Sequence, residues 1–246
     1  MLIYVYDGSF EGILTAVYEA YYRRENPEQI LSAQNITVNL FDSYKYIVSD
    51  REKSDKVYQA IRTKISDAAL RKNFHVFLSD DNDKATHIYR YLRLGFLYGP
   101  MIDNHLQEEC VSTVQQISRR VTFECHRFNG LIRFMKMERD IYYARFEPDH
   151  NITILLAPHF AKRLSDQNWI IHDTKRGIAV IYNQKEWMLT DHLPEVLPEL
   201  SEHEKSLQNI WQEYYQSIAI AERKNLRLQK NMMPYRYWKN LTEIGQ

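Results

Sequence analysis

Residues 131–147 read LIRFMKMERDIYYARFE, and this stretch decides the fold of the second half of the chain. Leu131–Met137 and Ile141–Glu147 are rich in apolar, β-branched and aromatic residues, and only Glu138–Asp140 lie between them. Two such runs joined by a short polar turn predict a β-hairpin. Further strands are expected at 169–172, 178–182 and 186–189, after a short helix at 155–164. We therefore expect a central antiparallel sheet of about five strands.

The N-terminal half has the pattern of a mainly helical region. Leu2–Tyr6 and Tyr44–Val48 predict a pair of short strands. Between and after them, apolar residues recur every three or four positions, which predicts helices. These helices are expected at 10–21, from 51 through the stripe Val57, Ile61, Ile65 and Ala68 or Ala69, at 74–78, at 86–96, and from 111 to a left-handed stop at Asn129-Gly130.

A last long helix is expected after Ser201, which forms a capping box with Glu204. Its apolar residues are expected to form a buried stripe: Leu207, Ile210, Trp211, Tyr214, Tyr215 and Ile218. The fold class is α+β: a helical N-terminal half with a short strand pair, a central antiparallel sheet, and a C-terminal helix and tail. Gly99-Pro100 separates an N-terminal region, 1–100, from a C-terminal region, 101–246, either as two domains or within one compact unit.

Composition removes several classes of function. The 246 residues carry 32 Lys and Arg against 32 Asp and Glu, which excludes a uniformly basic coat for nucleic acid and leaves local patches. Two cysteines cannot build a disulfide framework, a four-cysteine zinc site or an iron–sulfur cluster, and the seven glycines form no phosphate-binding loop. No apolar run is long enough to span a membrane, and the N-terminus lacks a secretory leader. We expect a cytoplasmic protein without membrane association and assign it no metal or cofactor.

The first candidate site is YDGSFEG at 6–12. Asp7 follows a strand and precedes a helix, where free backbone N–H groups favour negative charge. Asp7 could therefore contribute to an acid or anion site. Alternatively, Asp7 or Ser9 caps the helix.

The second candidate site is ECHRFNG at 124–130. Glu124, His126 and Arg127 near a helix end could form a general acid/base pair or half of a metal site. Because Glu124 and His126 are two residues apart, they share a helix face only if the helix ends between them. Alternatively, His126 and Arg127 cap the last carbonyls and offset the helix dipole. His159 could join such a site only through the tertiary fold.

The third candidate is the tail from 220 to 246, in which six cations face two acids, Glu222 and Glu243. The candidate nucleic-acid-binding residues are Arg223, Lys224, Arg227, Lys230, Arg236, Tyr237, Trp238 and Lys239. Cations can neutralise phosphates while aromatic rings stack on unpaired bases, each stack contributing roughly 1–3 kcal/mol. Alternatively, the tail is a solvated helix end followed by an aromatic strap packed on the sheet.

Five separated motifs resemble those of one bacterial family: 6–12, 124–130, LAPHFAKR at 156–163, QNWIIHD at 167–173 and, most closely, 222–243 with MPYRYWKNLTE. The chain resembles the family labelled "probable DNA metabolism protein", which carries a domain of unknown function. Its members are typically encoded beside a radical SAM protein assigned to DNA modification or repair, and a related domain is joined to a uracil-DNA-glycosylase-like domain in some bacteria. The resemblance implies a DNA-related role with a radical SAM partner. With two cysteines, this chain cannot hold that partner's three-cysteine cluster.

Three functional hypotheses follow. The first is a nucleic-acid-associated accessory protein that acts with a radical SAM partner in DNA repair or modification and binds single-stranded or damaged DNA through its tail. The second is an enzyme that acts on a base, nucleotide or phosphodiester through a polar cleft, with the candidate residues Asp7, Glu11, Glu124, His126, Arg127 and His159. The third is a protein–protein adaptor without DNA contact, because 18 tyrosines suit interfaces as well as cores.

Overall fold

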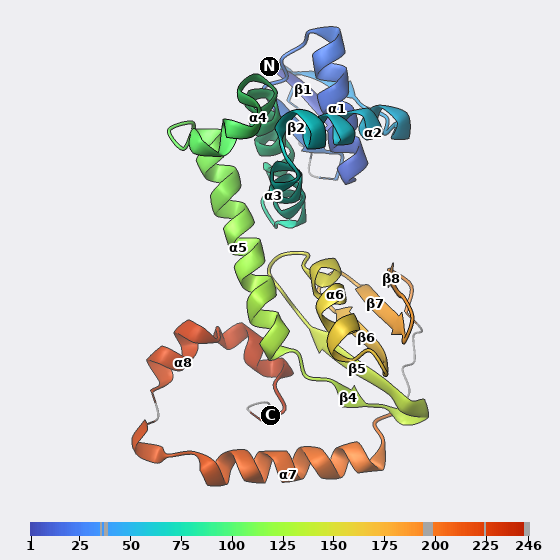
Figure 1. The fold of residues 1–246 in the computed structure, drawn as a ribbon, viewed down its shortest axis with the longest axis vertical. Coiled ribbons are helices and arrows are strands. Elements are labelled where there is room, and N and C mark those ends of the chain that lie inside the picture. Colours follow the sequence, from blue (N-terminus) through green and yellow to red (C-terminus); the bar gives the residue numbers. More distant parts are fainter. Residues whose placement is uncertain (35, 37–38, 194–198, 224, 244–246) are drawn as a thin grey trace. The chain divides into compact units, whose positions relative to one another are not determined.

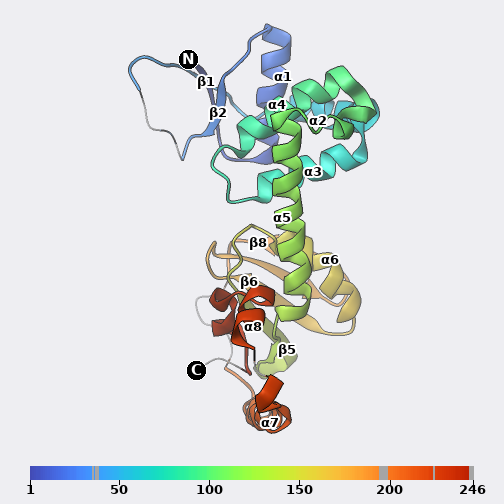
Figure 2. The same ribbon diagram turned by 90° about the vertical axis from the view of Figure 1, so that its left-hand side faces the viewer.

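The computed structural model describes residues 1–34, 36, 39–193, 199–223 and 225–243 (Figures 1 and 2). The chain divides into two compact units, Met1–Thr122 and Phe123–Gln246. Each unit has its own sheet and its own buried residues. The α+β fold class expected from the sequence is confirmed.

The N-terminal unit contains a three-stranded parallel sheet in the order β2-β1-β3. Its strands are β1 (Leu2–Tyr6), β2 (Gln29–Ser32) and β3 (Ser43–Tyr46). The helix α1 (Phe10–Arg23) connects β1 to β2. The sequence predicted only the pair β1 and β3. The strand β2 has four residues, of which only Ile30 is buried, so it is too short to show an alternating pattern.

The expected continuous helix from 51 through Ala69 is instead broken at Ser66. The helix α2 (Arg51–Ala60) continues into a π-helical turn, Ile61–Ile65, and α3 (Asp67–Leu78) then starts anew. Ser66 is extended, with φ −174° and ψ 159°, and its hydroxyl accepts a hydrogen bond from Ala69 N at 3.0 Å. The break follows because this side-chain cap competes with continued helix.

After α4 (Lys84–Tyr98) and a 3-10 segment, Gly99–Asn104, the long helix α5 (Glu109–Leu131) follows. The left-handed stop expected at Asn129-Gly130 is wrong, because α5 continues through both residues and Gly130 lacks positive φ. Arg133 instead satisfies the carbonyl of Gly130, to which its guanidinium donates at 2.8 Å. A side-chain donor thus replaces the glycine stop at this helix end.

The C-terminal unit contains a five-stranded sheet in the order β4-β5-β6-β7-β8. The strands are β4 (Met135–Lys136), β5 (Ile141–Phe146), β6 (Asn168–Asp173), β7 (Ile178–Asn183) and β8 (Trp187–Thr190). The predicted hairpin is the antiparallel pair β4 and β5. The sheet is mixed rather than wholly antiparallel, since β5 and β6 are parallel. A crossover through α6 (Thr153–Arg163) joins them, as a parallel connection requires.

The tail comprises α7 (Glu202–Ile218), a 3-10 turn at Ala221–Arg223, α8 (Leu226–Met232) and a 3-10 segment, Tyr235–Asn240. Ser201 caps α7 by accepting a hydrogen bond from Glu204 N, as the capping box predicts. The Glu204 carboxylate does not complete the box, because it accepts from Lys136 N of β4 instead. This contact ties the start of α7 to the edge of the sheet.

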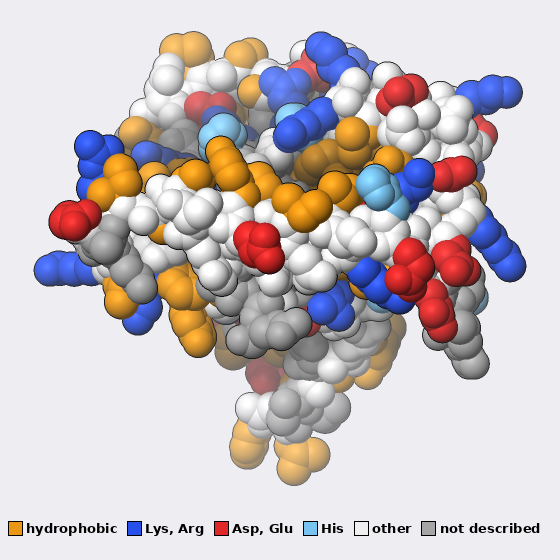
Figure 3. All heavy atoms as spheres, turned by 90° about the horizontal axis from the view of Figure 1, so that it is seen from below, with side chains coloured by type: hydrophobic (Ala, Val, Ile, Leu, Met, Phe, Trp, Pro, Cys, Tyr) orange, Lys and Arg blue, Asp and Glu red, His pale blue; other side chains and the backbone are white. Residues whose placement is uncertain are grey.

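The apolar stripe of α7 is exposed, contrary to the expectation that it is buried. Its six side chains are between 36% and 61% exposed, and α7 contains no buried residue. Figure 3 views the side on which Figure 1 shows α7, and hydrophobic side chains gather there in a band. Helical spacing correctly predicts that these residues share one face, but it cannot specify what covers that face.

Candidate nucleic-acid interface

The C-terminal tail is fixed to the rest of its unit through the buried carboxylate of Glu124, which is 5% exposed. One oxygen accepts from Asp149 N at 2.8 Å and from Tyr237 Oη at 2.6 Å, and the other accepts from His150 N at 2.8 Å. Three donors from a loop and from the tail thus converge on one residue of α5. We call these groups the Glu124 cluster.

Tyr237 belongs to the interior of the C-terminal unit. It is 3% exposed, and its ring meets Phe128 edge-on at 4.7 Å between centroids. Burial and the hydrogen bond to Glu124 raise the pKa of Tyr237, so the phenol remains a donor. The ring is therefore unable to stack on a base in this conformation, although the sequence placed it among the binding candidates.

Two tail cations are paired with acids of the same unit. Arg236 pairs with Asp149, and its guanidinium lies 4.8 Å from the centre of the Tyr237 ring. Lys239 pairs with Glu147, and this hydrogen bond lowers the pKa of that carboxyl. These two cations hold the tail in place. Because the carboxylate partner offsets each positive charge, their attraction for an external phosphate is weak.

On the same segment, Tyr235 faces solvent beside the half-buried Trp238. Tyr235 is 69% exposed, its ring centroid lies 5.0 Å from that of Trp238, and Lys230 Nζ lies 5.9 Å from the Tyr235 ring. Trp238 Nε1 donates to Met233 O at 2.9 Å, which fixes the indole. We call Lys230, Tyr235 and Trp238 the stacking platform.

A second exposed ring, with a half-buried cation over it, lies on α5 and contacts the tail. Phe123 is 55% exposed and Arg127 lies over its ring at 4.4 Å. Arg127 also donates to Asn231 O at 3.2 Å, which joins this pair to the end of α8. Both aromatic–cation pairs therefore border α8.

The tail carries two further exposed cations. Arg223 and Arg227 are exposed, and within the described ranges their side chains make no hydrogen bond or ion pair. Asn225 caps α8 by accepting from Leu228 N at 3.0 Å. Lys224 lies outside the described residues.

Asp7, the first candidate, is held by hydroxyl groups of the N-terminal unit. It accepts from Ser9 N at 2.9 Å, Ser9 Oγ at 2.7 Å and Ser49 Oγ at 2.7 Å, while Ser9 caps α1. Burial would raise the pKa of Asp7, but the hydrogen bonds from Ser49 and Ser9 outweigh it and lower the pKa. Glu11 lies in the first turn of α1 and is partly exposed.

The candidates Glu124, His126, Arg127 and His159 all belong to the C-terminal unit, but the structure does not assemble them into one hydrogen-bonded set. Because α5 does not end between Glu124 and His126, the former is buried and the latter exposed. His159 is exposed at α6 and meets Phe160 edge-on at 4.9 Å. In the part of the chain that the structure describes, neither histidine hydrogen-bonds to Glu124 or Arg127.

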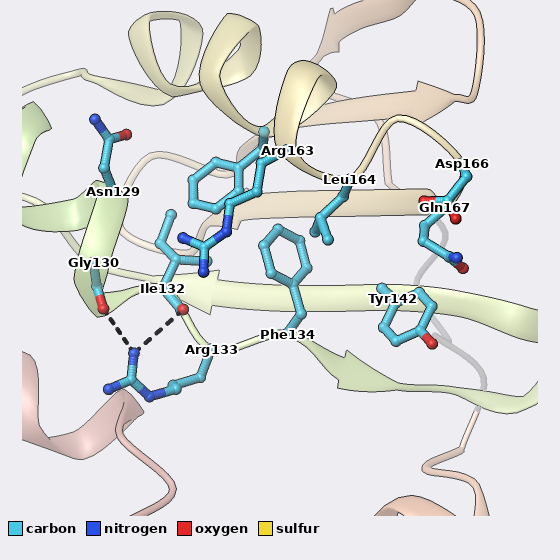
Figure 4. Close-up of a pocket in the computed structure, with 11 residues that line it drawn as sticks. Asn129, Gly130, Ile132, Arg133, Phe134, Tyr142, Arg163, Leu164, Asp166 and Gln167 are labelled. Atoms are coloured by element: carbon cyan, nitrogen blue, oxygen red, sulfur yellow. Dashed lines mark hydrogen bonds between the residues drawn. The ribbon is translucent and has the colours of Figure 1, made fainter.

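A separate pocket of about 380 Å³ opens where α5 ends and α6 returns to the sheet (Figure 4). Phe134, Phe160 and Tyr142 supply its aromatic walls. Arg133 lines it while donating to Ile132 O and pairing with Glu243, and Arg163 extends into it from the end of α6. The pocket therefore combines aromatic surface with guanidinium groups.

The sequence did not identify Tyr235, Phe123 or Arg163 as site residues. The spacing of Tyr235 and Trp238 offered one signal, because residues three apart share a face in a 3-10 helix. That spacing separates Tyr235 and Trp238 from the buried Tyr237. Arg163 gave no local signal, because its pocket forms only when α5, β5 and α6 come together.

A family described as a domain of unknown function, DUF4130, matches residues 82–243. The match covers more than half of the chain, which therefore belongs to this family. No curated protein matches the chain. Among the described residues, no helix is long and apolar enough to cross a bilayer, and no group of three or more His, Cys, Asp or Glu side chains could hold a metal ion.

Proposed function

We propose that this chain is a nucleic-acid-associated accessory protein that binds single-stranded or damaged DNA. The observation that carries the proposal is the stacking platform, where the exposed Tyr235 ring lies beside Trp238 and beneath Lys230. A flat ring offers a sequence-tolerant surface for an unpaired base, and a nearby ammonium group suits the adjoining phosphate. The resemblance to the DNA metabolism family supports DNA as the polymer.

The arrangement favours single strands over intact duplex. Bases in a duplex are stacked on one another and do not offer a face to a tyrosine, whereas unpaired bases do. Arg223, in the 3-10 turn before α8, and Arg227, in its first turn, are exposed cations that add positive charge to the same tail. The buried Glu124 cluster supports this surface by holding the segment beneath it.

Fluorescence anisotropy with a labelled single-stranded oligonucleotide, a duplex and a mismatched duplex tests this proposal. We expect single strands and mismatched duplex to bind more tightly than intact duplex, and Tyr235→Ala to weaken single-strand binding by roughly 1–3 kcal/mol. The matched control is Tyr214→Ala, which removes an exposed tyrosine of α7, away from the platform segment, and should leave single-strand affinity unchanged. Equal affinity of Tyr235→Ala and the wild type would refute the role of the platform.

We propose further that the exposed apolar face of α7 binds a protein partner, the radical SAM protein implied by the family resemblance. Leu207, Trp211 and Tyr214 are 45%, 44% and 52% exposed on this face. Exposed apolar patches of this kind are typical of protein interfaces, where Trp and Tyr are enriched. In this arrangement the chain presents DNA to an enzyme that carries out the chemistry.

Co-purification of the full chain with that radical SAM protein tests this second proposal. Leu207→Asp combined with Trp211→Asp should abolish co-purification while single-strand binding persists. Gln216→Asp adds an acid on the opposite side of the same helix and should have no effect. Retention of the complex by the double variant would show that α7 is not the contact.

A further inference from the structure

The pocket between the end of α5 and the end of α6 is chemically suited to one small ligand class. Its volume of about 380 Å³ falls within the range of roughly 300–1,000 Å³ that is typical of small-molecule sites. Phe134 stands between Arg163 and the pair Asp166 and Gln167, as Figure 4 shows. An aromatic surface thus separates a cation from groups that accept and donate hydrogen bonds.

The two arginines of the pocket are not equivalent. Arg133 is occupied, since it pairs with Glu243 and donates to Gly130 O and Ile132 O. Arg163 is exposed, and across the described ranges its guanidinium makes no hydrogen bond or ion pair. A guanidinium binds phosphate through two parallel N–H donors, and Arg163 has all of its donors available.

The remaining walls suit a planar, polar ring. The Phe134 ring is partly exposed and makes edge-on contacts with Phe160, at 5.2 Å, and Trp169, at 6.2 Å between centroids. Asp166 accepts hydrogen bonds and the Gln167 amide both accepts and donates them, which matches the mixed edge of a nucleobase. Neither side chain makes a hydrogen bond within the described residues, so both can turn towards a ligand.

We infer that this pocket binds a nucleoside 5′-monophosphate, with the phosphate on Arg163, the base against Phe134, and the base edge at Asp166 and Gln167. The nucleotide is either free or the phosphorylated 5′ end of a strand, which share this chemistry. The site involves none of the stacking-platform residues, so the inference stands independently of strand binding at the tail.

Isothermal titration calorimetry of the full chain with the four deoxynucleoside 5′-monophosphates tests the inference. We expect at least one to bind saturably, and deoxyadenosine and inorganic phosphate to bind at least tenfold more weakly, because each lacks half of the recognised groups. Arg163→Ala should weaken nucleotide binding tenfold or more, with partial recovery in Arg163→Lys. Lys162→Ala removes an exposed neighbouring cation that does not line the pocket and should bind as the wild type does.

Two further arms separate the possible outcomes. A 5′-phosphorylated tetranucleotide that binds more tightly than the monophosphate assigns the site to strand ends, and the reverse order assigns it to free nucleotides. Tyr235→Ala should lose strand affinity at the tail and keep monophosphate affinity, so failure of either proposal is distinguishable from failure of the other. Absence of saturable monophosphate binding, or equal binding by Arg163→Ala, would overturn the inference.

Discussion

Glu124 is a buried carboxylate that holds the C-terminal tail in place without itself lying on the exposed surface. It accepts three hydrogen bonds, from the backbone of Asp149 and His150 and from the side chain of Tyr237. A general acid/base needs a free oxygen within reach of substrate, whereas these donors and the burial of Glu124 leave it little access to one. Its position favours a structural role over the catalytic one that its neighbourhood in the sequence suggested.

Glu124→Ala should therefore destabilise the C-terminal unit by about 3 kcal/mol, because it leaves two backbone N–H groups and a phenol without their acceptor. Tyr237→Phe removes one hydrogen bond but keeps the ring, and should cost about 1 kcal/mol. Urea denaturation followed by circular dichroism measures both. A Glu124→Ala free energy of unfolding within 0.5 kcal/mol of the wild type, on the scale of ordinary surface changes, would contradict the role assigned to the cluster.

Cys125 follows Glu124 in the chain and is predicted to be unreactive. Burial, with a smaller contribution from Glu124, raises the pKa of its thiol from 9.0 to about 11. Only the thiolate is nucleophilic, so iodoacetamide at pH 8 should alkylate Cys125 about a hundredfold more slowly in the folded protein than in urea. Mass spectrometry of the peptide containing Cys125 measures the two rates, and similar rates would show that the thiol is not protected.

The tail segment depends on ion pairs that acid should release. The hydrogen bond from Lys239 holds the pKa of Glu147 below its ordinary value of 4.5. Because the folded pKa is lowered, the stabilisation is fully present above pH 4.5 and is lost as the pH falls through the folded value. The free energy of unfolding, measured between pH 7 and pH 3, should show this loss.

Lys239→Met should reduce the loss of unfolding free energy at low pH, since it removes the group that lowers the pKa of Glu147. Lys162→Met serves as the control, because Lys162 is an exposed lysine without a carboxylate partner in the described part of the chain. The control should retain the wild-type slope. If the free energy of unfolding depended on pH in the same way in the wild type and in Lys239→Met, this pair would not hold the tail.

At the level of elements, sequence patterns predict most of the helices and strands, but not which strands pair or what each helix packs against. The hairpin β4–β5 and the strands β6, β7 and β8 are visible in the sequence because apolar residues alternate and turns separate them. The parallel pairing of β5 with β6 is not visible, since it depends on where α6 crosses the sheet. The same holds for the apolar face of α7, which is exposed although its spacing is typical of a buried helix.

The candidate site was predictable in part. The concentration of cations and rings in the tail is plain in the sequence, but Tyr237 lies in the interior and Tyr235 at the surface. Their different positions come from contacts far along the chain, chiefly between Tyr237 and Glu124. No local rule identifies which of two tyrosines, two residues apart, meets a distant carboxylate.

For the whole molecule, net charge gives no indication of nucleic-acid binding, because 32 basic residues balance 32 acidic ones. The cations of the tail fall into two groups, those with and those without an acidic partner. Arg236 and Lys239 pair with Asp149 and Glu147, whereas Arg223, Arg227 and Lys230 form no ion pair among the described residues. The proposed function therefore rests on the second group.

The salt dependence of single-strand affinity tests that assignment most directly. Each neutralised phosphate contributes about −0.7 to the slope of log affinity against log salt concentration, so three cations predict a slope of about −2. Arg227→Ala combined with Lys230→Ala should reduce its magnitude by about 1.4, while Lys185→Ala, an exposed cation between β7 and β8, should not. A slope near zero, or one that the double variant leaves unchanged, would contradict binding of a DNA strand by the tail.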